Sequence, residues 1–380
     1  MKILYMTPST YNSGGTEHIL SMKVNYLVRK AAYEVVIVTT DQKNRENFFE
    51  FDESVRHYDI GLNYEDDFQK NLIAKAVSHY YKNHVYKKRL MAIVQKERPD
   101  ICVSLFGKEI DFLYKMKLPC KTVAELHFNK MFRYDFLMSH HQGWIWKQIG
   151  LHEVKRMVKE TKSLDRLVVL TKEDLEQWKK TNDNVFQIYN PLPYEGNKVA
   201  ELGNKSLISV GRLCQQKNYS SLIRAWRSVY QRHPDWHMNI WGDGEMHDQL
   251  QQEIVQYGLE NVFHLCGRTD NIKEKYLESS AYVMSSRYEG FPMVLLEAAS
   301  FGLPMISYSC YCGPKDIIKD GENGFLIKQD DEQGLADTIC RVIEDTVLRK
   351  TLGHQAKQFS RCFLQENILS LWPNFFRELC

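Results

Sequence analysis

Short hydrophobic segments rich in β-branched residues alternate with amphipathic segments along almost the whole chain. This alternation is typical of parallel sheets that carry helices on both faces. The expected strands of a first series are 3–6, 35–40, 101–105, 122–125, 167–170 and 185–188, and those of a second series are 207–210, 238–241, 262–265, 282–285, 305–308 and 325–327. We therefore predict an α/β protein with two Rossmann-like, doubly wound parallel sheets.

A polar segment at 195–205, which contains two glycines, separates the two series. We predict an N-terminal domain over residues 1–192 and a C-terminal domain over 193–364, because 380 residues exceed one ordinary core. The segment of about 365–380 is rich in Leu, Trp and Phe, and we expect it to pack back on the first domain; an amphipathic tail for a partner is the alternative. Doubly wound sheets bind ligands at the carboxyl ends of their strands, so we expect a cleft between the domains.

The composition favours a cytoplasmic protein. Nine cysteines show no CxxC pair or framework spacing, as expected of reduced thiols. The first apolar run is too short for a signal peptide, and no run is long enough to span a membrane.

The net charge of +2 combines a positive first half with a negative second half; the basic half could face anionic lipid or an anionic acceptor, or reflect ordinary scatter. No basic stripe interleaved with aromatics suggests nucleic-acid binding.

The most informative segment is 289–297, which reads Glu-Gly-Phe-Pro-Met-Val-Leu-Leu-Glu directly after an expected strand. Pro292 suits the first turn of a helix, and Gly290 lets backbone approach a ligand closely. The free N–H groups of a helix start form a natural diphosphate site. Glu289 and Glu297 would then address two hydroxyl-bearing parts of one ligand. The alternative is a capping acid and an ordinary surface glutamate.

Two cations, Arg212 and Lys217, stand in the loop that follows the strand 207–210. Arginine offers a bidentate fork to phosphate and lysine a point charge. We expect them to bind a diphosphate, with two solvated surface cations as the alternative. The next helix is expected to be capped by Asn218 or Ser220.

Together these two segments resemble the donor-binding motifs of family 4 retaining glycosyltransferases of the GT-B fold, the glycosyl transferases group 1. Residues 14–17, Gly-Gly-Thr-Glu, resemble the N-terminal glycine loop of that family, 242–244 one of its turns, and 313–325 its C-terminal segment. Matches are dense in the expected C-terminal domain and sparse before it. His18 stands where the family often has arginine, and the lead-in Cys-Tyr-Cys at 310–312 is unusual, so both leave the choice of sugar open.

The resemblance implies a role for each matching residue. Arg212 and Lys217 would hold the diphosphate and stabilise the leaving group, Glu297 would bond the ribose hydroxyls, and Glu289 would meet the transferred sugar. His127 matches a histidine that approaches the donor sugar, although a structural histidine stays an alternative. The implied catalytic set is Glu289, His127, Arg212 and Lys217, and the implied donor-binding set is Gly14, Gly15, Arg212, Lys217, Gly290, Phe291, Pro292, Met293, Val294 and Glu297.

No two aspartates stand two residues apart, so the Asp-x-Asp by which many transferases hold a divalent metal is missing. We expect a metal-independent enzyme without a cofactor, in which protein cations stabilise the departing diphosphate. The expected reaction is retaining transfer of a hexose or N-acetylhexosamine from a nucleotide diphosphate sugar to a glycan or lipid-linked acceptor of surface polysaccharide or glycolipid. UDP-sugar is the first expected donor and GDP-mannose the second.

Two other functions fit the same architecture: a non-hydrolysing nucleotide-sugar 2-epimerase, and a catalytically silent nucleotide-sugar-binding subunit. Retention through same-face attack and through a covalent intermediate both stay open. The segment 140–156 mixes aromatics with cations and could contact a membrane surface. A helix packed on the core is the alternative.

Overall fold

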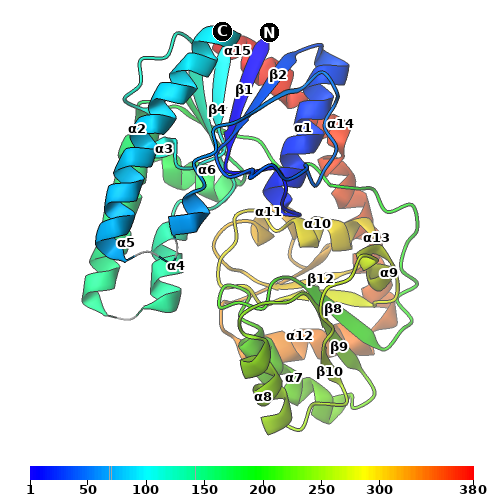
Figure 1. Ribbon diagram of the computed structural model, residues 1–380. Coiled ribbons are helices and arrows are strands. Elements are labelled where there is room, and N and C mark those ends of the chain that lie inside the picture. The colour runs from blue at the N-terminus through cyan, green and yellow to red at the C-terminus, as the bar shows by residue number, and fades with distance from the viewer. Residues whose placement is uncertain (68, 70, 142) are drawn as a thin grey trace. The chain divides into compact units, whose positions relative to one another are not determined.

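The computed structural model describes residues 1–67, 69, 71–141 and 143–380. Contacts within the chain divide it into two compact units (Figure 1). Unit 1 comprises residues 1–130, 151–193 and 365–380, and unit 2 comprises 131–150 and 194–364. The chain thus passes from unit 1 to unit 2 at 193/194, beside the expected boundary at 192/193. The C-terminal segment groups with unit 1, whereas residues 131–150, expected in the first domain, group with unit 2.

Unit 1 is built on a parallel sheet with the strand order β3-β2-β1-β4-β5-β6-β7 among the described residues. The strands are β1 (Lys2–Thr7), β2 (Glu34–Thr39), β3 (Arg56–Asp59), β4 (Ile101–Ser104), β5 (Lys121–Leu126), β6 (Arg166–Val169) and β7 (Val185–Gln187). The inner strands are buried along nearly their whole length, which explains their β-branched composition. The sequence did not predict β3, because this edge strand reads Arg-His-Tyr-Asp and is largely exposed.

Helices cover the sheet of unit 1 and follow its strands. They are α1 (Gly15–Ala31), η1 (Tyr64–Asp67), α2 (Leu72–Glu97), α3 (Ile110–Leu113), α5 (Trp144–Lys162, which begins in the unit 2 segment), α6 (Lys172–Lys179), α14 (Gln365–Leu369) and α15 (Leu371–Leu379). The last helix packs on unit 1 through a buried apolar face. Phe376 is fully buried, and the ring of Phe375 lies 5.5 Å from that of Phe186 in β7.

Unit 2 has a parallel sheet with the order β10-β9-β8-β11-β12-β13 among the described residues. Its strands are β8 (Ser206–Val210), β9 (His237–Trp241), β10 (Phe263–Leu265), β11 (Ala281–Met284), β12 (Met305–Tyr308) and β13 (Gly324–Ile327). Its helices are α4 (Phe132–His140), α7 (Tyr219–Arg232), α8 (His247–Gln256), α9 (Ile272–Leu277), α10 (Met293–Ser300), α11 (Pro314–Ile317), α12 (Glu332–Glu344), α13 (Thr346–Ser360) and η2 (Arg361–Phe363). Helices α7 and α12 pack together, and α10 packs with α13.

Asn218 is the N-cap residue of α7, at one of the two expected positions, but its side chain does not cap the helix. Asn218 occupies the N-cap position in a left-handed conformation (φ 54°), and its side chain donates to Asp330 instead of accepting from the helix. Ser220 donates to Glu253. Both side chains form hydrogen bonds with residues distant in sequence, so neither accepts from the first N–H groups of the helix.

The two-sheet α/β architecture predicted from the sequence is confirmed, and each predicted strand lies within about one residue of an observed one. In both sheets the first strand lies inside, and the strand order reverses beside it. The reversal falls between β1 and β4 in unit 1 and between β8 and β11 in unit 2. Doubly wound sheets bind their ligands at such a switch point, so the carboxyl ends of the strands beside it mark a candidate site in each unit.

Candidate active site

The switch point of unit 2 carries a buried ion pair. Lys217, in the loop after β8, places Nζ 2.7 Å from Oε1 of Glu289, in the loop after β11. Glu289 is only 7% exposed. Burial of Lys217 works against its charged form, but the neighbouring Glu289 carboxylate outweighs this and leaves the pKa of Lys217 above its ordinary value. The ammonium of Lys217 is therefore held in its charged form.

Hydrogen bonds join the two loops that carry this pair. The Arg287 N–H donates to the Gln216 carbonyl at 2.8 Å, and the Gln216 side chain donates to the Tyr288 carbonyl at 2.9 Å. The Ser285 hydroxyl donates to the carbonyl of Lys217 itself at 2.8 Å. Backbone on both sides is thereby fixed, so Lys217 and Glu289 meet without depending on two flexible side chains alone.

Gly211 provides the space through which Lys217 reaches its partner. A Cβ at position 211 would stand 3.1 Å from Cε of Lys217 and 2.9 Å from Oη of Tyr219. The lysine stem therefore crosses directly over the glycine that ends β8. The glycine of the Gly-Arg-Leu sequence at this strand end is therefore explained by packing, in addition to any role in binding a ligand.

Helix α10 begins beside the ion pair in sequence, with Pro292 at its N-cap. Within the described chain, the N–H groups of Met293 and Val294 in its first turn make no backbone hydrogen bond. Gly313 (φ 100°) packs on the Pro292 ring, which a Cβ there would overlap. The unpaired N–H groups and the helix dipole make this end a favourable place for a phosphate.

The other residues of segment 289–297 lie in two environments. Phe291 is buried and packs against Phe363, with ring centroids 5.9 Å apart. Gly290 is half-buried. Glu297, in the second turn of α10, accepts through Oε2 from the hydroxyls of Tyr276 (2.9 Å) and Tyr194 (3.1 Å).

Glu297 combines burial with a free acceptor. Burial raises its pKa, and the Tyr276 and Tyr194 hydroxyls partly oppose this shift. Its Oε1 accepts no hydrogen bond from the described residues, so it remains available to a ligand hydroxyl. Sequence reasoning found Glu297 but not the two tyrosines, because they lie far along the chain and follow no periodic pattern around it.

Arg212 differs from Lys217 in its surroundings. Its side chain is exposed and forms no ion pair with any residue that the structure describes. The loop after β8 therefore presents one enclosed and one solvent-exposed cation.

In unit 1, the loop after β1 leads into α1 through the predicted glycine loop. Gly14 is the N-cap of α1, and the Glu17 carboxylate folds over it so closely that a Cβ would collide. Gly15 is exposed, and a Cβ added there would meet no other atom within 4 Å. The start of α1 thus combines open space at Gly15 with a half-buried Glu17, whose pKa is raised by burial.

His127 follows the end of β5 in the same unit. Its Nε2 lies 3.6 Å from Oε2 of Glu125, which forms an ion pair with Lys23 of α1. All three side chains are almost completely buried. Glu125 and His127 are two residues apart and so point to the same face, a signal present in the sequence. Nothing local in the sequence indicates Lys23.

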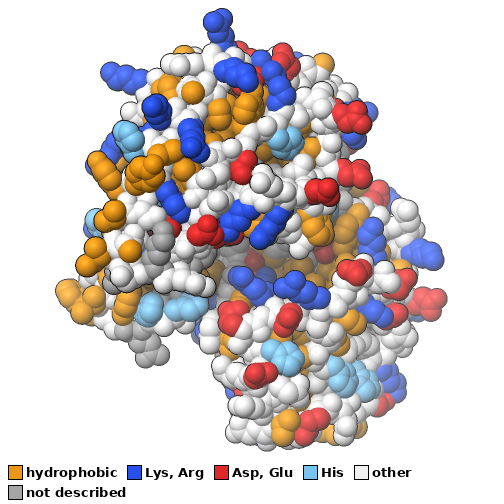
Figure 2. Space-filling model, viewed as in Figure 1, with side chains coloured by type: hydrophobic (Ala, Val, Ile, Leu, Met, Phe, Trp, Pro, Cys, Tyr) orange, Lys and Arg blue, Asp and Glu red, His pale blue; other side chains and the backbone are white. Residues whose placement is uncertain are grey.

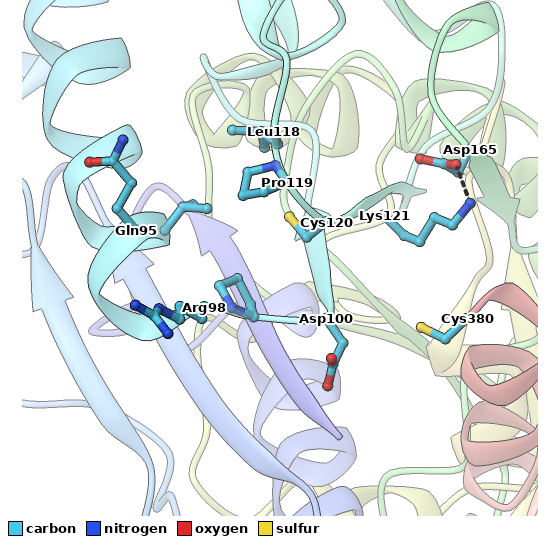
Figure 3. A pocket seen from close by; sticks show the side chains of 11 residues that line it. Gln95, Arg98, Asp100, Leu118, Pro119, Cys120, Lys121, Asp165 and Cys380 are labelled. Atoms are coloured by element: carbon cyan, nitrogen blue, oxygen red, sulfur yellow. Dashed lines mark hydrogen bonds and ion pairs between the residues drawn. The ribbon is translucent and has the colours of Figure 1, made fainter.

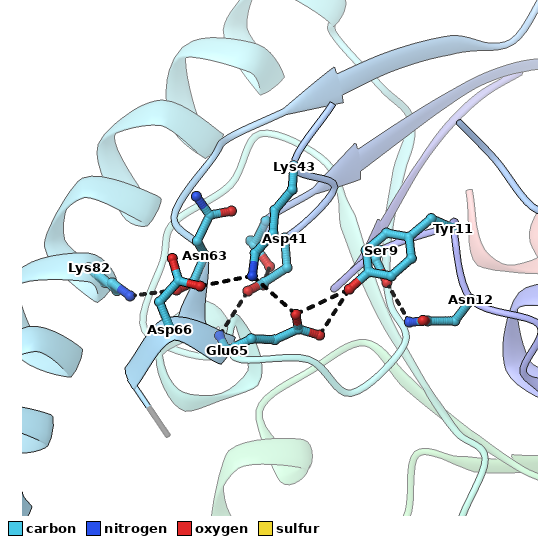
Figure 4. Close-up of polar contacts among 10 residues, drawn as sticks. Ser9, Tyr11, Asn12, Asp41, Lys43, Asn63, Glu65, Asp66 and Lys82 are labelled. Atoms are coloured by element: carbon cyan, nitrogen blue, oxygen red, sulfur yellow. Dashed lines mark hydrogen bonds and ion pairs between the residues drawn. The ribbon is translucent and has the colours of Figure 1, made fainter. Parts of the chain in front are cut away.

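A polar cluster ties together the loops after β1, β2 and β3 (Figure 4). The Tyr11 hydroxyl donates to Glu65 at 3.1 Å, and Lys43 bridges Glu65 (3.3 Å) and Asp66 (2.8 Å). The Glu65 N–H in turn donates to Asp41 at 3.1 Å. These contacts brace the carboxyl edge of the sheet that also carries the glycine loop.

A pocket of about 1000 Å³ lies at the opposite edge of unit 1 (Figure 3). It is lined by residues that precede β4, β5 and β6, among them Asp100, Cys120 and Asp165. These positions are at the amino ends of the strands. Because doubly wound sheets bind their ligands at the carboxyl ends, this pocket is not the candidate active site.

Two helices expose apolar side chains to an unusual degree. Trp144 and Ile145, at the start of α5, are 72% and 65% exposed, so this end of the segment 140–156 is not packed on a core. Gln142 of that segment lies outside the described residues. Hydrophobic side chains also gather at the surface over α2 (Figure 2), and its exposed members follow helical spacing: Ile73, Val77, Tyr80 and Tyr81.

Two kinds of feature are missing from the described residues. No group of three or more His, Cys, Asp or Glu side chains in that part of the chain is arranged to hold a metal ion. None of the helices described is both long and apolar enough to cross a bilayer.

Comparison with known proteins finds similarity to glycosyltransferases. Residues 195–359 match the family model of glycosyl transferases group 1. An uncharacterized glycosyltransferase of Haemophilus influenzae is 26% identical over 98% of this chain and 98% of its own length. A Campylobacter jejuni GalNAc-alpha-(1->4)-GalNAc-alpha-(1->3)-diNAcBac-PP-undecaprenol alpha-1,4-N-acetyl-D-galactosaminyltransferase is 26% identical over 100% of this chain and 99% of its own.

The fold has close counterparts among solved structures. Anabaena HepE in complex with UDP-glucose superposes with a TM-score of 0.72 at 18% identity, covering 100% of both chains. The family model covers most of the unit that carries the Lys217–Glu289 pair and α10. With its two doubly wound sheets, the chain has the GT-B fold, and its residues 195–359 are similar to the group 1 glycosyltransferases.

Proposed function

We propose that the chain is a retaining, metal-independent glycosyltransferase that uses a UDP-sugar to extend a glycan or a lipid-linked acceptor. The observation that carries the proposal is the buried contact between Lys217 and Glu289 at the switch point of unit 2. An ammonium held in a poorly solvated site is well suited to a leaving group that gains negative charge. The neighbouring start of α10 supports the same assignment.

The proposed reaction breaks the bond between the anomeric carbon and the phosphate oxygen. Lys217, Arg212 and the N–H groups of Met293 and Val294 stabilise the negative charge on the departing UDP. The acceptor hydroxyl oxygen attacks on the same face, and its proton passes to the phosphate oxygen, so the configuration is retained. No bound metal is needed for this charge stabilisation.

The remaining site residues are proposed to select the donor. Oε1 of Glu297 accepts from a ribose hydroxyl, while the tyrosines on Oε2 keep the carboxylate in place. Glu289 meets hydroxyls of the transferred sugar, and Lys217 orients it. In unit 1, His127, the backbone of Gly14 and the open backbone of Gly15 contact the substrate.

The donor and acceptor classes follow from similarity. A UDP-sugar is preferred because a solved structure of the same fold holds UDP-glucose. A lipid-linked acceptor is preferred because the C. jejuni relative of equal length is named for an undecaprenol diphosphate-linked glycan. The exposed apolar residues at the start of α5 and along α2 support peripheral membrane contact, with the enzyme on the cytoplasmic side.

The test is a UDP-release assay with UDP-glucose, UDP-N-acetylglucosamine, UDP-N-acetylgalactosamine and GDP-mannose, each with and without EDTA. We expect one UDP-sugar to be cleaved at the same rate with EDTA, and cleavage to fall at least ~100-fold in Lys217→Ala. Lys328→Ala is the matched control, because Lys328 is an exposed lysine of the same unit.

Three outcomes would contradict the proposal. Activity that disappears with EDTA and returns with Mg²⁺ or Mn²⁺ would overturn metal independence. Conversion of the UDP-sugar into an isomer without UDP release would indicate a 2-epimerase. Binding of a UDP-sugar without turnover under any condition would indicate a silent binding subunit.

A further inference from the structure

Unit 1 contains a buried ion pair with no evident need for charge. Lys23 and Glu125 are each 2% exposed and form a direct hydrogen-bonded ion pair. Burial opposes the ionised form of both, yet Lys23 and His127 keep the pKa of Glu125 below its ordinary value. Apolar residues of similar volume commonly stabilise a core as well as such a pair does, so packing alone does not explain it.

The carboxylate of this pair faces His127. Oε2 of Glu125 accepts from Lys23 and lies 3.6 Å from Nε2 of His127, just beyond hydrogen-bond distance. Among the described residues, Oε1 of Glu125 and Nε2 of His127 have no hydrogen-bond partner at all. A small rotation of the imidazole ring would therefore satisfy two buried polar atoms together.

The surroundings of the pair keep the carboxylate in one position. The Lys23 ammonium lies 3.8 Å from the ring centroid of Trp372 in α15 and 5.6 Å from that of Tyr5 in β1. The titratable and charged groups that face Glu125 and His127 are Tyr5, Glu17, Lys23 and each other. Lys23 is the only lysine or arginine in this described set, so no other such side chain competes with it for Glu125.

We propose that Glu125 and Lys23 are positioning residues, which orient His127 toward a sugar substrate at the carboxyl end of the sheet. Glu125 accepts the Nε2–H of His127, so Nδ1 is left unprotonated and accepts from a sugar hydroxyl. Lys23 keeps Glu125 ionised and immobile, and Trp372 covers the ammonium. This inference rests on the proposed function, because it assumes that His127 contacts the substrate.

The first test uses a double variant, Lys23→Met with Glu125→Gln, which removes both charges and leaves no unpaired ion in the core. We expect the double variant to keep the parental melting temperature and the parental affinity for UDP, which binds unit 2. Its kcat for the cleaved UDP-sugar falls between about 10- and 100-fold, because the imidazole is no longer held in position. When Lys23→Met and Glu125→Gln are added to His127→Ala, we expect kcat to be no lower than in His127→Ala alone.

The same assay separates the possible failures. If the parent cleaves a UDP-sugar and the folded double variant does so at the parental rate, the pair is structural and the inference is wrong. If the parent cleaves none of the sugar nucleotides, the proposed function itself has failed. If the double variant and His127→Ala lose activity additively, the pair acts independently of His127 and the inference is also wrong.

A second measurement does not depend on any variant folding. In parent protein labelled with ¹⁵N-histidine, at a pH where the ring is neutral, we expect the His127 ring nitrogens to report a protonated Nε2 and an unprotonated Nδ1. A protonated Nδ1 would overturn the proposed orientation directly.

Discussion

At the scale of single residues, the site in unit 2 is a set of charges and polar atoms held by specific neighbours. Lys217 pairs with Glu289, and two tyrosine hydroxyls hold one oxygen of Glu297. These three charged residues could be predicted from the sequence, because they lie in loops or helices directly after predicted strands and because the two acids have a characteristic spacing. The sequence did not predict the tyrosines or Lys23, since tertiary contacts alone bring them to their partners.

Removing one member of the Lys217–Glu289 pair should cost stability as well as activity. Lys217→Met removes the ammonium that pairs with the Glu289 carboxylate, and we expect a loss on the order of 3 kcal/mol in the free energy of unfolding. Adding Glu289→Gln to this variant should restore much of the stability but no UDP release. Urea unfolding followed by circular dichroism measures both, and a single variant as stable as the parent would show that the charges are not coupled.

Glu297→Gln should separate stability from donor binding. The pKa of Glu297 in the folded protein lies above its ordinary value of 4.5, so the folded protein binds more protons than the unfolded chain as the pH rises through that window. Stability contributed by this group therefore falls from about pH 4.5 upward, until the folded-state pKa is passed. The glutamine variant lacks this loss, so its stability at neutral pH should equal or exceed that of the parent.

The glutamine variant should also bind UDP more weakly than the parent, because a neutral amide is a poorer acceptor for a ribose hydroxyl than a carboxylate. Calorimetric titration with UDP measures the affinity, and thermal melts at pH 5 and pH 8 measure the stability. Asp320→Asn, in an exposed turn of the same unit, is the matched control. A glutamine variant that melts lower at pH 8 but binds UDP normally would contradict both statements.

At the scale of elements, the strands and helices show which structures a hydrophobic pattern predicts and which it does not. The strands and α7 were predicted because buried faces impose regular spacing. The edge strand β3 was missed because its side chains are largely exposed to water. Asn218 is the N-cap residue of α7, but it does not cap the helix with its side chain, because Asn218 and Ser220 bind tertiary partners. Exposed apolar faces, such as that of α2, carry the same spacing as buried ones, so only the structure separates them.

The start of α5 is the element whose role in membrane contact is easiest to test. Trp144→Ser combined with Ile145→Ser removes two exposed apolar side chains and should leave the folded state unchanged within about 0.5 kcal/mol. We expect the variant to lose most of its sedimentation with vesicles that contain anionic phospholipid. The matched control is Val347→Ser, an exposed apolar residue of α13. Equal sedimentation of parent and variant would show that α5 does not contact the membrane.

At the scale of the whole molecule, two sheets of the same topology place two sets of polar residues at their carboxyl ends. The alternation of strand and helix patterns predicted both sheets. Central parallel strands are buried on both faces, so they are rich in β-branched residues, and few other structures have this composition. The assignment of residues 131–150 to unit 2 could not be predicted, because contacts distant in sequence decide it. The candidate site of unit 2 was more predictable than that of unit 1, because its residues lie in two short segments.

The measurement that most directly tests the account is a crystal structure of the chain grown with UDP. We predict that the diphosphate lies in the loop between β8 and α7, with an oxygen within hydrogen-bond distance of Lys217 and others near Arg212 and the N–H groups of Met293 and Val294. The ribose hydroxyls should face Oε1 of Glu297. A diphosphate bound away from Lys217 and from the start of α10, or held by a metal ion in their place, would contradict the account.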